Sequence, residues 1–518
     1  MSNKAKDNSH YVDRPFNIRP ICFWAFFVGL TIAVCIGASE HVWVVGIYFT
    51  VLIGVFVGLQ FLKCRDKVLT FFGTSRINFI VTIALCLVVA LSFAITTLTY
   101  TQQRSFASFQ DLSGVVERHN LDADGSGWFI LRNAKFGTAS VDGHVRVFVE
   151  HPNESTLANV VSTHRVLVNT QIHRATASEW NINNNIKYRA NLGASDVVAP
   201  VGVDRSPRSV ILRHSQSFLR THMRERNADL MFAMLFGDRS TLDGELSESF
   251  SLTGLAHVLA VSGLHVGILV GMLMVILKLL RVPRKYQVFI IGAVLLFYCY
   301  LCGFRYSILR AAIMFMVFLI RRAFLKSNDM LSSISLAAIV ILVLFPHALM
   351  SVSFQFSFAC MLGIALFRLP YANFFRNKTK LPMWLSNSLA MYLATFVAVL
   401  PLMLRYFGFV SVVGVITNVV FLPLLVVAFQ ASAIAVLTWV AFPLLYVVNI
   451  MLDGIVGATT WLASLPFASF GISGGGFWFL LYFLGLILTT RFIFLRKRYK
   501  YPAAAILILL YSVFVLFL

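Results

Sequence analysis

The sequence predicts an all-α polytopic membrane bundle of about 13 transmembrane helices with a small inserted all-β domain. Three observations support this prediction. Of the 518 residues, 58% are hydrophobic and only 13% are charged. The apolar residues fall in runs of about 17 to 25, the length that crosses a hydrocarbon core of roughly 30 Å. Between two hydrophobic blocks lies a polar stretch of about a hundred residues that is rich in β-formers and turn signals.

The order of the hydrophobic runs divides the chain into four regions. Residues 1–100 hold three transmembrane helices, residues 101–205 the extracytoplasmic β domain, residues 206–240 an amphipathic basic interfacial helix, and residues 241–518 the second transmembrane block. The expected helix cores are, in order, 18–37, 41–62, 78–100, 255–280, 286–303, 307–320, 331–345, 351–367, 384–404, 416–440, 443–465, 477–495 and 502–518. The run 307–320 is short enough to be tilted, broken or re-entrant.

Basic residues orient the bundle. They precede the first expected span and lie between the second and third, at Lys4, Lys6, Arg14, Arg19, Lys63, Arg65, Lys67 and Arg76. Such clusters mark cytoplasmic loops, so we expect a cytoplasmic N-terminus and a β domain outside the cytoplasm. The first span has no small-residue cleavage site and is interpreted as an anchor. Because basic loops account for much of the net charge of +21, basicity alone is weak support for nucleic-acid binding.

The polar stretch shows the pattern of short strands. Its β-formers cluster in residues 112–117, 128–132, 145–150 and 165–172, which predicts a small antiparallel barrel. Asp122 and Asp124 imitate the opening of a calcium loop, but Asn133 stands where a bidentate Glu is needed, so a hairpin turn is favoured. Trp128 and Phe129 could stack on bases, although alternation along a strand places at least one of them in the core.

The main candidate site lies where a strongly apolar helix is entered through glycines, histidines and hydroxyls. Residues 236–280 read FGDRSTLDGELSESFSLTGLAHVLAVSGLHVGILVGMLMVILKLL. Because an unpartnered polar group in hydrocarbon costs several kcal/mol, His257, Ser262 and His265 are expected to face protein or water. Ser262 and Gly263 permit a helix break between the two histidines. Further ligands are lacking, so the histidines are expected to fix the broken helix or line a polar path, and no metal is expected.

Other polar residues extend this site. Arg305 and Arg310 flank the short span at membrane depth, which makes them candidates to line a pore, with snorkelling to the interface as the alternative. Buried amides are further candidates. The pore or path candidates are therefore His257, Ser262, Gly263, His265, Arg305, Arg310, Gln355 and Asn418.

A second group is expected at the entrance. Asp238 and Arg239 precede the motif helix and could pair with each other or with the arginines of the short span. Three arginines, Arg213, Arg220 and Arg224, punctuate the helical pattern of residues 206–240. They suit either anionic lipid headgroups or a phosphate-contacting collar.

Cofactor and nucleotide motifs are missing from the sequence. Cys299 and Cys302 form a C-x-x-C pair without a second pair, so both are expected to be small core residues. The chain contains no G-x-x-x-x-G-K-[ST] loop, so it is not expected to couple transport to nucleotide hydrolysis by itself. We therefore expect no cofactor and a separate helicase-type motor.

Several motifs resemble the ComEC family of competence channels, which carry single-stranded DNA across the bacterial cytoplasmic membrane during natural transformation. They are GDRSTL, GLAHVLAVSGLHVG, LCGFRYSILRAAIM, SFQFSFACMLGI and TNVVFLPLL, and the resemblance covers nearly the whole chain. It implies an OB-like fold for the external β domain, a multi-pass protein of the cytoplasmic membrane, single-stranded DNA as the cargo, and a DNA-receptor protein on the outer side. Longer members of the family also carry a metallo-β-lactamase-like nuclease domain. No H-x-H-x-D-H motif occurs here, so the resemblance implies a separate nuclease.

Two other function classes stay open at this point. A secondary transporter or lipid-linked flippase would use acidic relay residues within spans, where Asp453 is the main acidic residue. A membrane hydrolase would use Ser262 with His257 or His265 and an orienting acid, and no such acid is fixed nearby in the sequence. We therefore expect a DNA channel rather than an enzyme.

Overall fold

The protein is described from a computed structural model. The described residues are 25, 28–32, 84–95, 110–121, 126–137, 139–141, 143–150, 160–161, 164–175, 186–192, 196–259, 261–321, 323, 330–379, 381–440, 443–471, 482, 485–486 and 506. The first two expected spans and the last two lie almost entirely outside these residues, and the expected third span is represented by the helix Ala84–Ile95.

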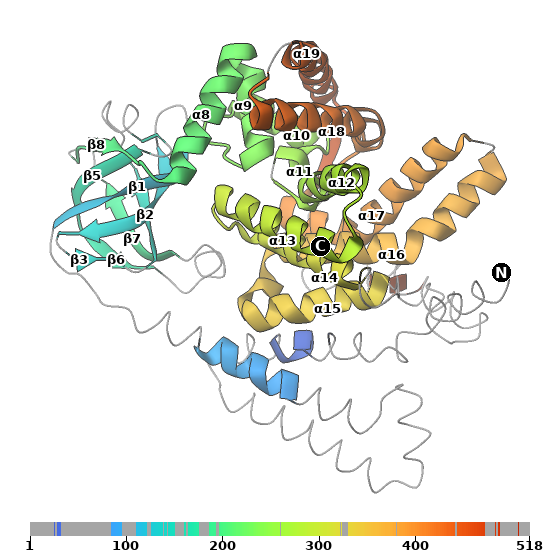
Figure 1. Cartoon of the computed structure of the whole chain (residues 1–518), viewed down its shortest axis with the longest axis horizontal. Coiled ribbons are helices and arrows are strands. Elements are labelled where there is room, and N and C mark those ends of the chain that lie inside the picture. The colour runs from blue at the N-terminus through green and yellow to red at the C-terminus, as the bar shows by residue number, and fades with distance from the viewer. Residues whose placement is uncertain are drawn as a thin grey trace, which may run out of the picture.

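The polar stretch forms the predicted β region (Figure 1). Its strands are β1 (Gln110–Leu121), β2 (Gly127–Phe136), β3 (Ala139–Ser140), β4 (His144–Val149), β5 (His164–Thr170), β6 (Ile172–Arg174), β7 (Ile186–Leu192) and β8 (Ala199–Val203). They pair in the order β6-β7-β4-β2-β1-β5-β8, with β3 on β2. The β4–β7 pair is parallel, unlike the fully antiparallel barrel that the sequence predicted, because β5 and β6 intervene in the chain and return it in the same direction.

Alternation along these strands builds one apolar core. On β4 the side chains of Val145, Val147 and Val149 are buried, whereas the intervening ones are only half-buried. Phe129 is fully buried and Trp128 is half-buried. This agrees with the prediction that alternation along the strand places at least one of the two residues in the core. One face of the sheet thus packs inward while the other carries polar and aromatic side chains.

From residue 207 onward the described chain is mainly helical. Its elements are α8 (Pro207–His222), α9 (Glu225–Phe236), α10 (Gly244–Leu252), α11 (Ala256–Leu259), α12 (Gly263–Leu279), α13 (Arg284–Leu301), α14 (Tyr306–Ile320), α15 (Met330–Leu344), η3 (Pro346–Met350), α16 (Val352–Thr379), α17 (Met383–Phe407), β9 (Phe409–Ser411), α18 (Gly414–Thr438), α19 (Leu444–Ala463) and β10 (Ser469–Gly471). Among the described residues, α13, α16, α17, α18 and α19 are long and apolar enough to cross a membrane. Shorter apolar helices include α12, α14 and α15. The chain is therefore a membrane protein by composition and helix length.

Residues 206–240 form two helices rather than one interfacial helix. Helix α8 ends at Met223, and α9 turns back toward the bundle (Figure 1). Asn227 and every following residue to Phe236 are buried, because α9 packs against α11, α18 and α19. Helix α9 is therefore part of the protein core, whereas α8 keeps one side exposed.

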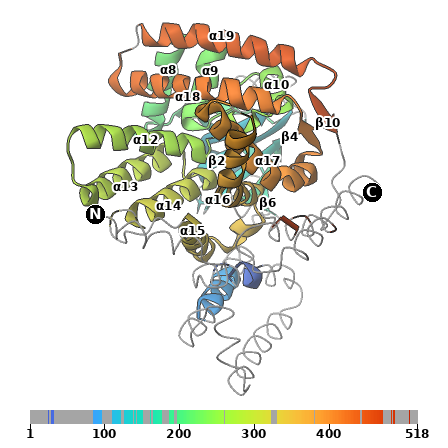
Figure 2. The same cartoon turned by 90° about the vertical axis from the view of Figure 1, so that its right-hand side faces the viewer.

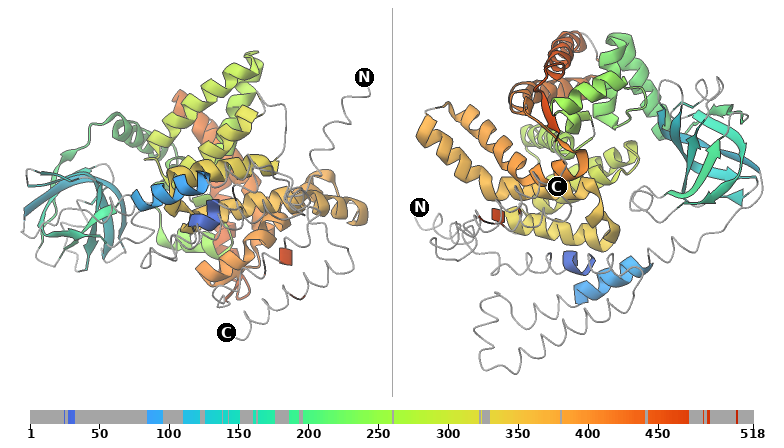
Figure 3. Two further views of the ribbon diagram at one scale, coloured as in Figure 1. Left: turned by 90° about the horizontal axis from the view of Figure 1, so that it is seen from below. Right: turned by 180° about the vertical axis from the view of Figure 1, so that it is seen from behind.

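Helices α12, α13 and α14 lie side by side, and α18 and α19 form a hairpin beside them (Figure 2). The β domain lies to one side of the helices in both views of Figure 3. The strands β9 and β10 pair after α17 and α19, respectively, and so tie both ends of the α18–α19 hairpin together. Helices α9, α14 and α18 pack against α11 and α12 and so lie around the motif segment 254–267.

Candidate functional site: a broken helix held by side chains

The motif segment is a helix interrupted in the middle of the bundle. Helix α11 stops at Leu259, and α12 starts at Gly263 after an extended Ser262. The Ser262 Oγ atom accepts from the Leu264 N–H at 3.3 Å, and His265 Nδ1 accepts from the Ser262 N–H at 3.1 Å. This is a capping box in which His265 occupies the usual position of Glu or Gln. The structure thus has a break at the position where the sequence permits one.

Gly254 allows the segment to enter this arrangement. Its φ angle is +77°, and a Cβ atom added there would lie 3.2 Å from Gly414 Cα and 3.3 Å from Ser411 Cβ. The left-handed conformation and the close backbone of α18 both favour glycine. The motif glycine therefore fixes how closely α10 approaches α18.

Backbone carbonyls around the break are satisfied by side chains from other elements. The Thr253 carbonyl accepts from Thr417 Oγ1 at 2.7 Å, and the Gly254 carbonyl accepts from Asn418 Nδ2 at 3.5 Å. Downstream, the Leu259 carbonyl accepts from Arg239 Nε at 2.9 Å. The Val261 carbonyl accepts from Ser307 Oγ at 3.1 Å. Irregular backbone at membrane depth needs such partners, so this break is built into the fold.

The two motif histidines face different surroundings. The His265 side chain is 1% exposed and packs on the Phe429 ring, with 4.8 Å between the centroids. Its Nε2 atom has no hydrogen-bond partner within the described part of the chain. By contrast, the His257 side chain is exposed, and so are the neighbouring Gly263 and Leu264. The N-terminal end of α12 is therefore accessible from outside the packed core.

Ser262 and His265 do not form a complete catalytic arrangement. The Ser262 Oγ atom lies 3.3 Å from His265 Nδ1, which already accepts from the Ser262 N–H. A triad requires an acid on the second ring nitrogen. In the described residues that nitrogen, His265 Nε2, bonds no carboxylate.

The entrance candidates Asp238 and Arg239 and the path candidate Arg305 form hydrogen bonds with backbone groups. Arg305 donates to the Gly237 carbonyl, Arg239 donates to Leu259, and Asp238 Oδ1 accepts from the Ser240 N–H at 3.1 Å. Burial, and then the nearby charge of Arg305, lowers the pKa of Arg239 to about 10. Arg239 therefore stays charged at neutral pH beside the broken helix.

Arg310 is a deeply buried cation on α14. Its side chain is 2% exposed and donates to the hydroxyls of Ser351 and Ser353. No carboxylate pairs with it among the described residues, and its Nε atom has no partner there. A buried charge without a counter-ion is costly, which marks Arg310 as the least compensated cation of the site.

The two amide candidates have structural partners. Gln355 accepts from the Tyr406 hydroxyl at 2.9 Å and donates to the Leu349 carbonyl at 3.3 Å. Asn418 donates to the Gly414 carbonyl at 2.7 Å, one turn back on α18. These bonds therefore join Gln355 to Tyr406 and Leu349, outside the motif segment, whereas Asn418 contacts the segment at the Gly254 carbonyl.

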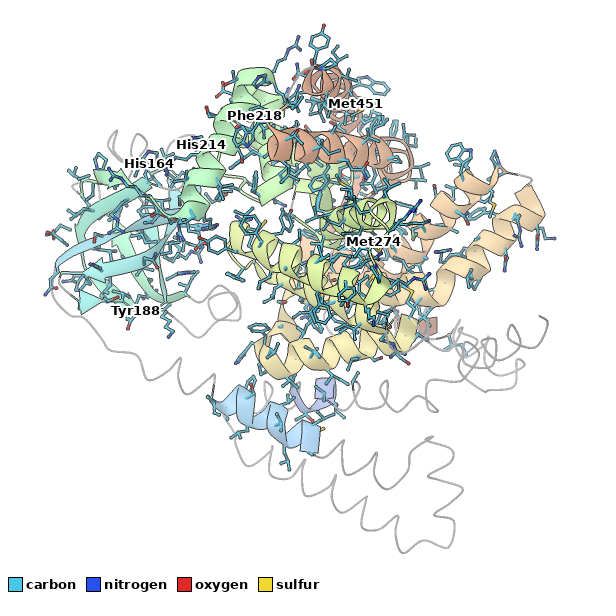
Figure 4. The ribbon with its side chains drawn as sticks, viewed as in Figure 1. His164, Tyr188, His214, Phe218, Met274 and Met451 are labelled. Carbon is cyan, nitrogen blue, oxygen red and sulfur yellow. The ribbon has the colours of Figure 1, made fainter. Side chains whose placement is uncertain are left out.

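The three arginines of α8 and its end are also engaged. Arg213 donates to the Asp204 carbonyl at 2.8 Å, and Arg220 forms two hydrogen bonds with Asp229, at 3.0 and 2.8 Å. Arg224 pairs with Asp453 of α19 at 2.5 Å. These contacts join α8, α9 and α19 to one another. His214 and Phe218 of α8 face the Trp439 ring at the end of α18, with 6.5 and 5.1 Å between the ring centroids; Figure 4 labels both, together with Met451 on α19.

A polar junction that the sequence did not indicate connects the β domain to α8. Arg132 of β2 pairs with Asp204 at 2.6 Å, and Arg208 lies 3.9 Å from Glu117 of β1. Burial opposes ionisation of Asp204, but hydrogen bonds from Ser209 and Ser206 and the charge of Arg132 outweigh it and lower its pKa. Each acid is far in sequence from the arginine that it faces, so no local sequence pattern identifies the two pairs.

The outer face of the β sheet carries an aromatic and basic cluster. Trp128 and Phe148 are directly opposite on β2 and β4. The Arg146 guanidinium lies 4.7 Å from the centroid of the Trp128 ring and 4.4 Å from that of Phe148. Arg189 of β7 is in register with Arg146. This face combines flat rings with positive charge.

Known proteins resemble the part of the chain that contains this site. Residues 234–497, just over half of the chain, match the family model described as Competence protein. ComE operon protein 3 of Bacillus subtilis is 30% identical over 223 residues, 43% of this chain and 28% of that protein. Recombination protein 2 of Haemophilus influenzae is 28% identical over 214 residues, 38% of this chain and 26% of that protein. An uncharacterized protein of Aquifex aeolicus is 29% identical over 238 residues, 45% and 54% of the two chains.

The matched segments therefore span between about a quarter and just over half of the length of these relatives. No solved structure matches the chain. The family match includes the broken helix, the buried Arg310 and the α18–α19 hairpin. Because this match covers more than half of the sequence, the protein belongs to the ComEC family of competence proteins.

Proposed function

We propose that this protein takes part in DNA uptake during competence, as the channel through which single-stranded DNA crosses the bacterial cytoplasmic membrane. The observation that supports this best is the break between α11 and α12, where the side chain of His257 and the backbone of Gly263 are exposed. Broken helices whose backbone groups are satisfied by side chains are typical of membrane proteins that conduct polar cargo.

The charges near the break suit a polyanion. Arg239 and Arg305 lie at the entrance, and Arg310 is buried beyond it. The N-terminal end of α12 adds the positive end of a helix dipole. A phosphate that leaves water needs compensating positive groups along its path, and this arrangement supplies them from three elements.

The outer face of the β domain suits the same cargo. Trp128 and Phe148 offer rings for base stacking, and Arg146 and Arg189 offer charges for phosphates. Stacking on aromatic side chains beside a basic groove is the usual mode of sequence-tolerant binding to single strands. In this proposal the β domain is an OB-like domain outside the cytoplasm. It binds the single strand before the strand enters the helical bundle.

The proposal includes partners. The sequence lacks a nucleotide-binding loop, so a separate cytoplasmic motor would draw the strand inward. A DNA-receptor protein would deliver the duplex on the outer side, and a separate nuclease would degrade the other strand. The N-terminus would lie in the cytoplasm, as the basic flanks of the first spans predict.

Import of labelled DNA into a deletion strain tests this function. The strain is complemented with the wild type or with Arg310→Ala, His257→Ala or His265→Ala, at matched membrane levels. Arg376→Ala is the control, because Arg376 is exposed at the far end of α16 and bonds only its neighbour Asn373 among the described residues. We expect the deletion to abolish import of DNA into the cytoplasm, and the Arg310 and His257 variants to reduce it at least tenfold.

Normal import in the deletion strain would disprove the channel function. Normal import by all three site variants, with the deletion strain inactive, would instead refute the path assigned to these residues. DNA that binds to the cell surface but stays sensitive to external nuclease would place the defect at the membrane step.

A further inference from the structure

We propose that a groove between α12, α13 and α14 binds one anionic phospholipid, with its phosphate on Lys278 and Arg284 and an acyl chain in the groove. The groove has a volume of about 500 Å³. Its walls are apolar side chains from all three helices, among them Met274, Val288 and Leu319. Figure 4 labels Met274 on α12 in this region. A volume of this size suits a lipid chain rather than a few water molecules.

The polar side chains of the groove cluster where these helices meet. Lys278 stands in the last turn of α12, and Arg284 is the first residue of α13. Both side chains are exposed. The intervening turn is fixed, because Gln287 donates from Nε2 to the Val282 carbonyl at 2.8 Å and the Val282 N–H donates to Leu277 at 3.0 Å. The two charges are therefore held at the end of an apolar groove.

Charge complementarity identifies the occupant as anionic. The sequence contains no Asp or Glu from residue 249 to residue 328, so this helical layer brings no acidic residue of its own to the two cations. The α13 N-terminus adds the positive end of a helix dipole and has no side-chain cap. Basic pockets between transmembrane helices are recognised sites for lipid headgroups. A zwitterionic lipid such as phosphatidylcholine would also fill the groove, but its ammonium group would repel the two cations and weaken its binding.

Selective lipid retention by the purified full-length chain tests this site. The protein is equilibrated in detergent with equal amounts of phosphatidylglycerol and phosphatidylcholine of the same chain length, and bound lipids are counted by native mass spectrometry. We expect the wild type to retain phosphatidylglycerol preferentially. The double variant Lys278→Gln/Arg284→Gln is expected to lower this preference about 25-fold, at about fivefold for each charge. Lys285→Gln is the matched control, because Lys285 is exposed at the same turn and does not line the groove.

A second pair of variants tests the groove without touching the charges. Gly271 lines the groove, and a Cβ atom added there would meet no atom within 4 Å, so the side chain of Gly271→Leu has open space at its base and occupies part of the groove. Gly457→Leu on α19 is its control, since Gly457 also has open space around it. We expect Gly271→Leu to lower retention of both lipids and Gly457→Leu to leave it unchanged.

Equal retention of both lipids by the wild type would overturn the proposal, as would a double variant that behaves like Lys285→Gln. Full retention by Gly271→Leu would show that the chain of the bound lipid lies elsewhere, which also refutes the site. The assay contains no DNA, so its result is independent of the proposed channel function.

Discussion

Arg239 Nε donates to the Leu259 carbonyl at 2.9 Å, across 20 positions of the chain. This bond ties the loop after α9 to the last residue of α11, just before the helix break. Arg305, which holds the Gly237 carbonyl two residues before Arg239, approaches the same loop from α14. Two arginines therefore fix the loop and the break as one unit.

Arg239→Ala should destabilise this unit. A hydrogen bond from a charged group contributes about 1.5–3 kcal/mol, and its loss leaves a buried carbonyl unpaired. We expect a lower melting temperature of the detergent-solubilised protein, measured by tryptophan fluorescence. Arg226→Ala is the control, because Arg226 forms only a 3.6 Å pair with Asp243 and its side chain is 45% exposed. Equal melting temperatures of the two variants would contradict this assignment.

Arg310→Met should raise stability while it lowers import. Burying a charge without a counter-ion is unfavourable, and an apolar residue of similar length is typically neutral or stabilising, by about 1–4 kcal/mol. Melting in detergent measures the first effect, and uptake of labelled DNA measures the second. A strongly destabilised Arg310→Met would indicate that Arg310 is a structural residue and that its import defect follows from misfolding.

Arg224 and Asp453 should be energetically coupled across α9 and α19. They lie 2.5 Å apart, but the Arg224 side chain is 71% exposed, so the coupling energy is expected to be about 0.2–1 kcal/mol. A double-mutant cycle with Arg224→Ala and Asp453→Asn measures it. Asn227→Ala is expected to cost more than Arg224→Ala, because Asn227 is buried and donates to both Asn449 and Asp453.

Gly363 should tolerate no larger residue. A Cβ atom there would lie 2.4 Å from the Ala394 carbonyl oxygen and 2.6 Å from Ala398 Cβ, so Gly363→Ala forces α16 and α17 apart. Overpacking of this kind costs about 1–3 kcal/mol. Gly454→Ala has open space and should be stabilising by up to about 1 kcal/mol. Comparison of the two melting temperatures checks the contact, and an unchanged Gly363→Ala would refute it.

His119 should make the β domain less stable in mild acid. Burial lowers its pKa below the ordinary value of 6.5, although the charge of Asp238 opposes this shift. The unfolded chain therefore binds more protons than the folded one below pH 6.5, and stability falls as the pH decreases through that value. Melting temperatures at pH 7.5 and 5.5 should differ more in the wild type than in His119→Gln. The exposed His173→Gln is the control and should retain the full pH effect.

Helix positions in the second block followed from hydrophobic run length, since most of the described helices cover the expected cores. The break at Ser262 also agreed with local chemistry, because serine and glycine end one helix and cap the next. The partners of the arginines did not follow from sequence. Arg220 faces Asp229 only because α8 and α9 form a hairpin, and Arg224 meets Asp453 through a contact between elements more than two hundred positions apart.

The β domain shows the same limit. Alternation identified β1, β2, β4 and β5. Strands β8 and β7 were missed, although β7 (Ile186–Leu192) does alternate, with buried apolar side chains between Lys187, Arg189 and Asn191. Its parallel pairing with β4 depends on how the chain crosses the sheet, which local propensity does not encode.

The short β9–β10 ladder has a mechanical consequence for the α18–α19 hairpin. Backbone hydrogen bonds close residues 412–468 into a loop at one end of the hairpin. They come from the three residue pairs of the ladder and from the Val412 N–H, which donates to the Ala468 carbonyl. Elsewhere on the hairpin, Phe218 of α8 packs on the Trp439 ring with 5.1 Å between the centroids, and Arg224 pairs with Asp453 in the middle of α19. The ladder therefore joins the two ends of the hairpin by main-chain hydrogen bonds, whereas these contacts depend on which side chains are present.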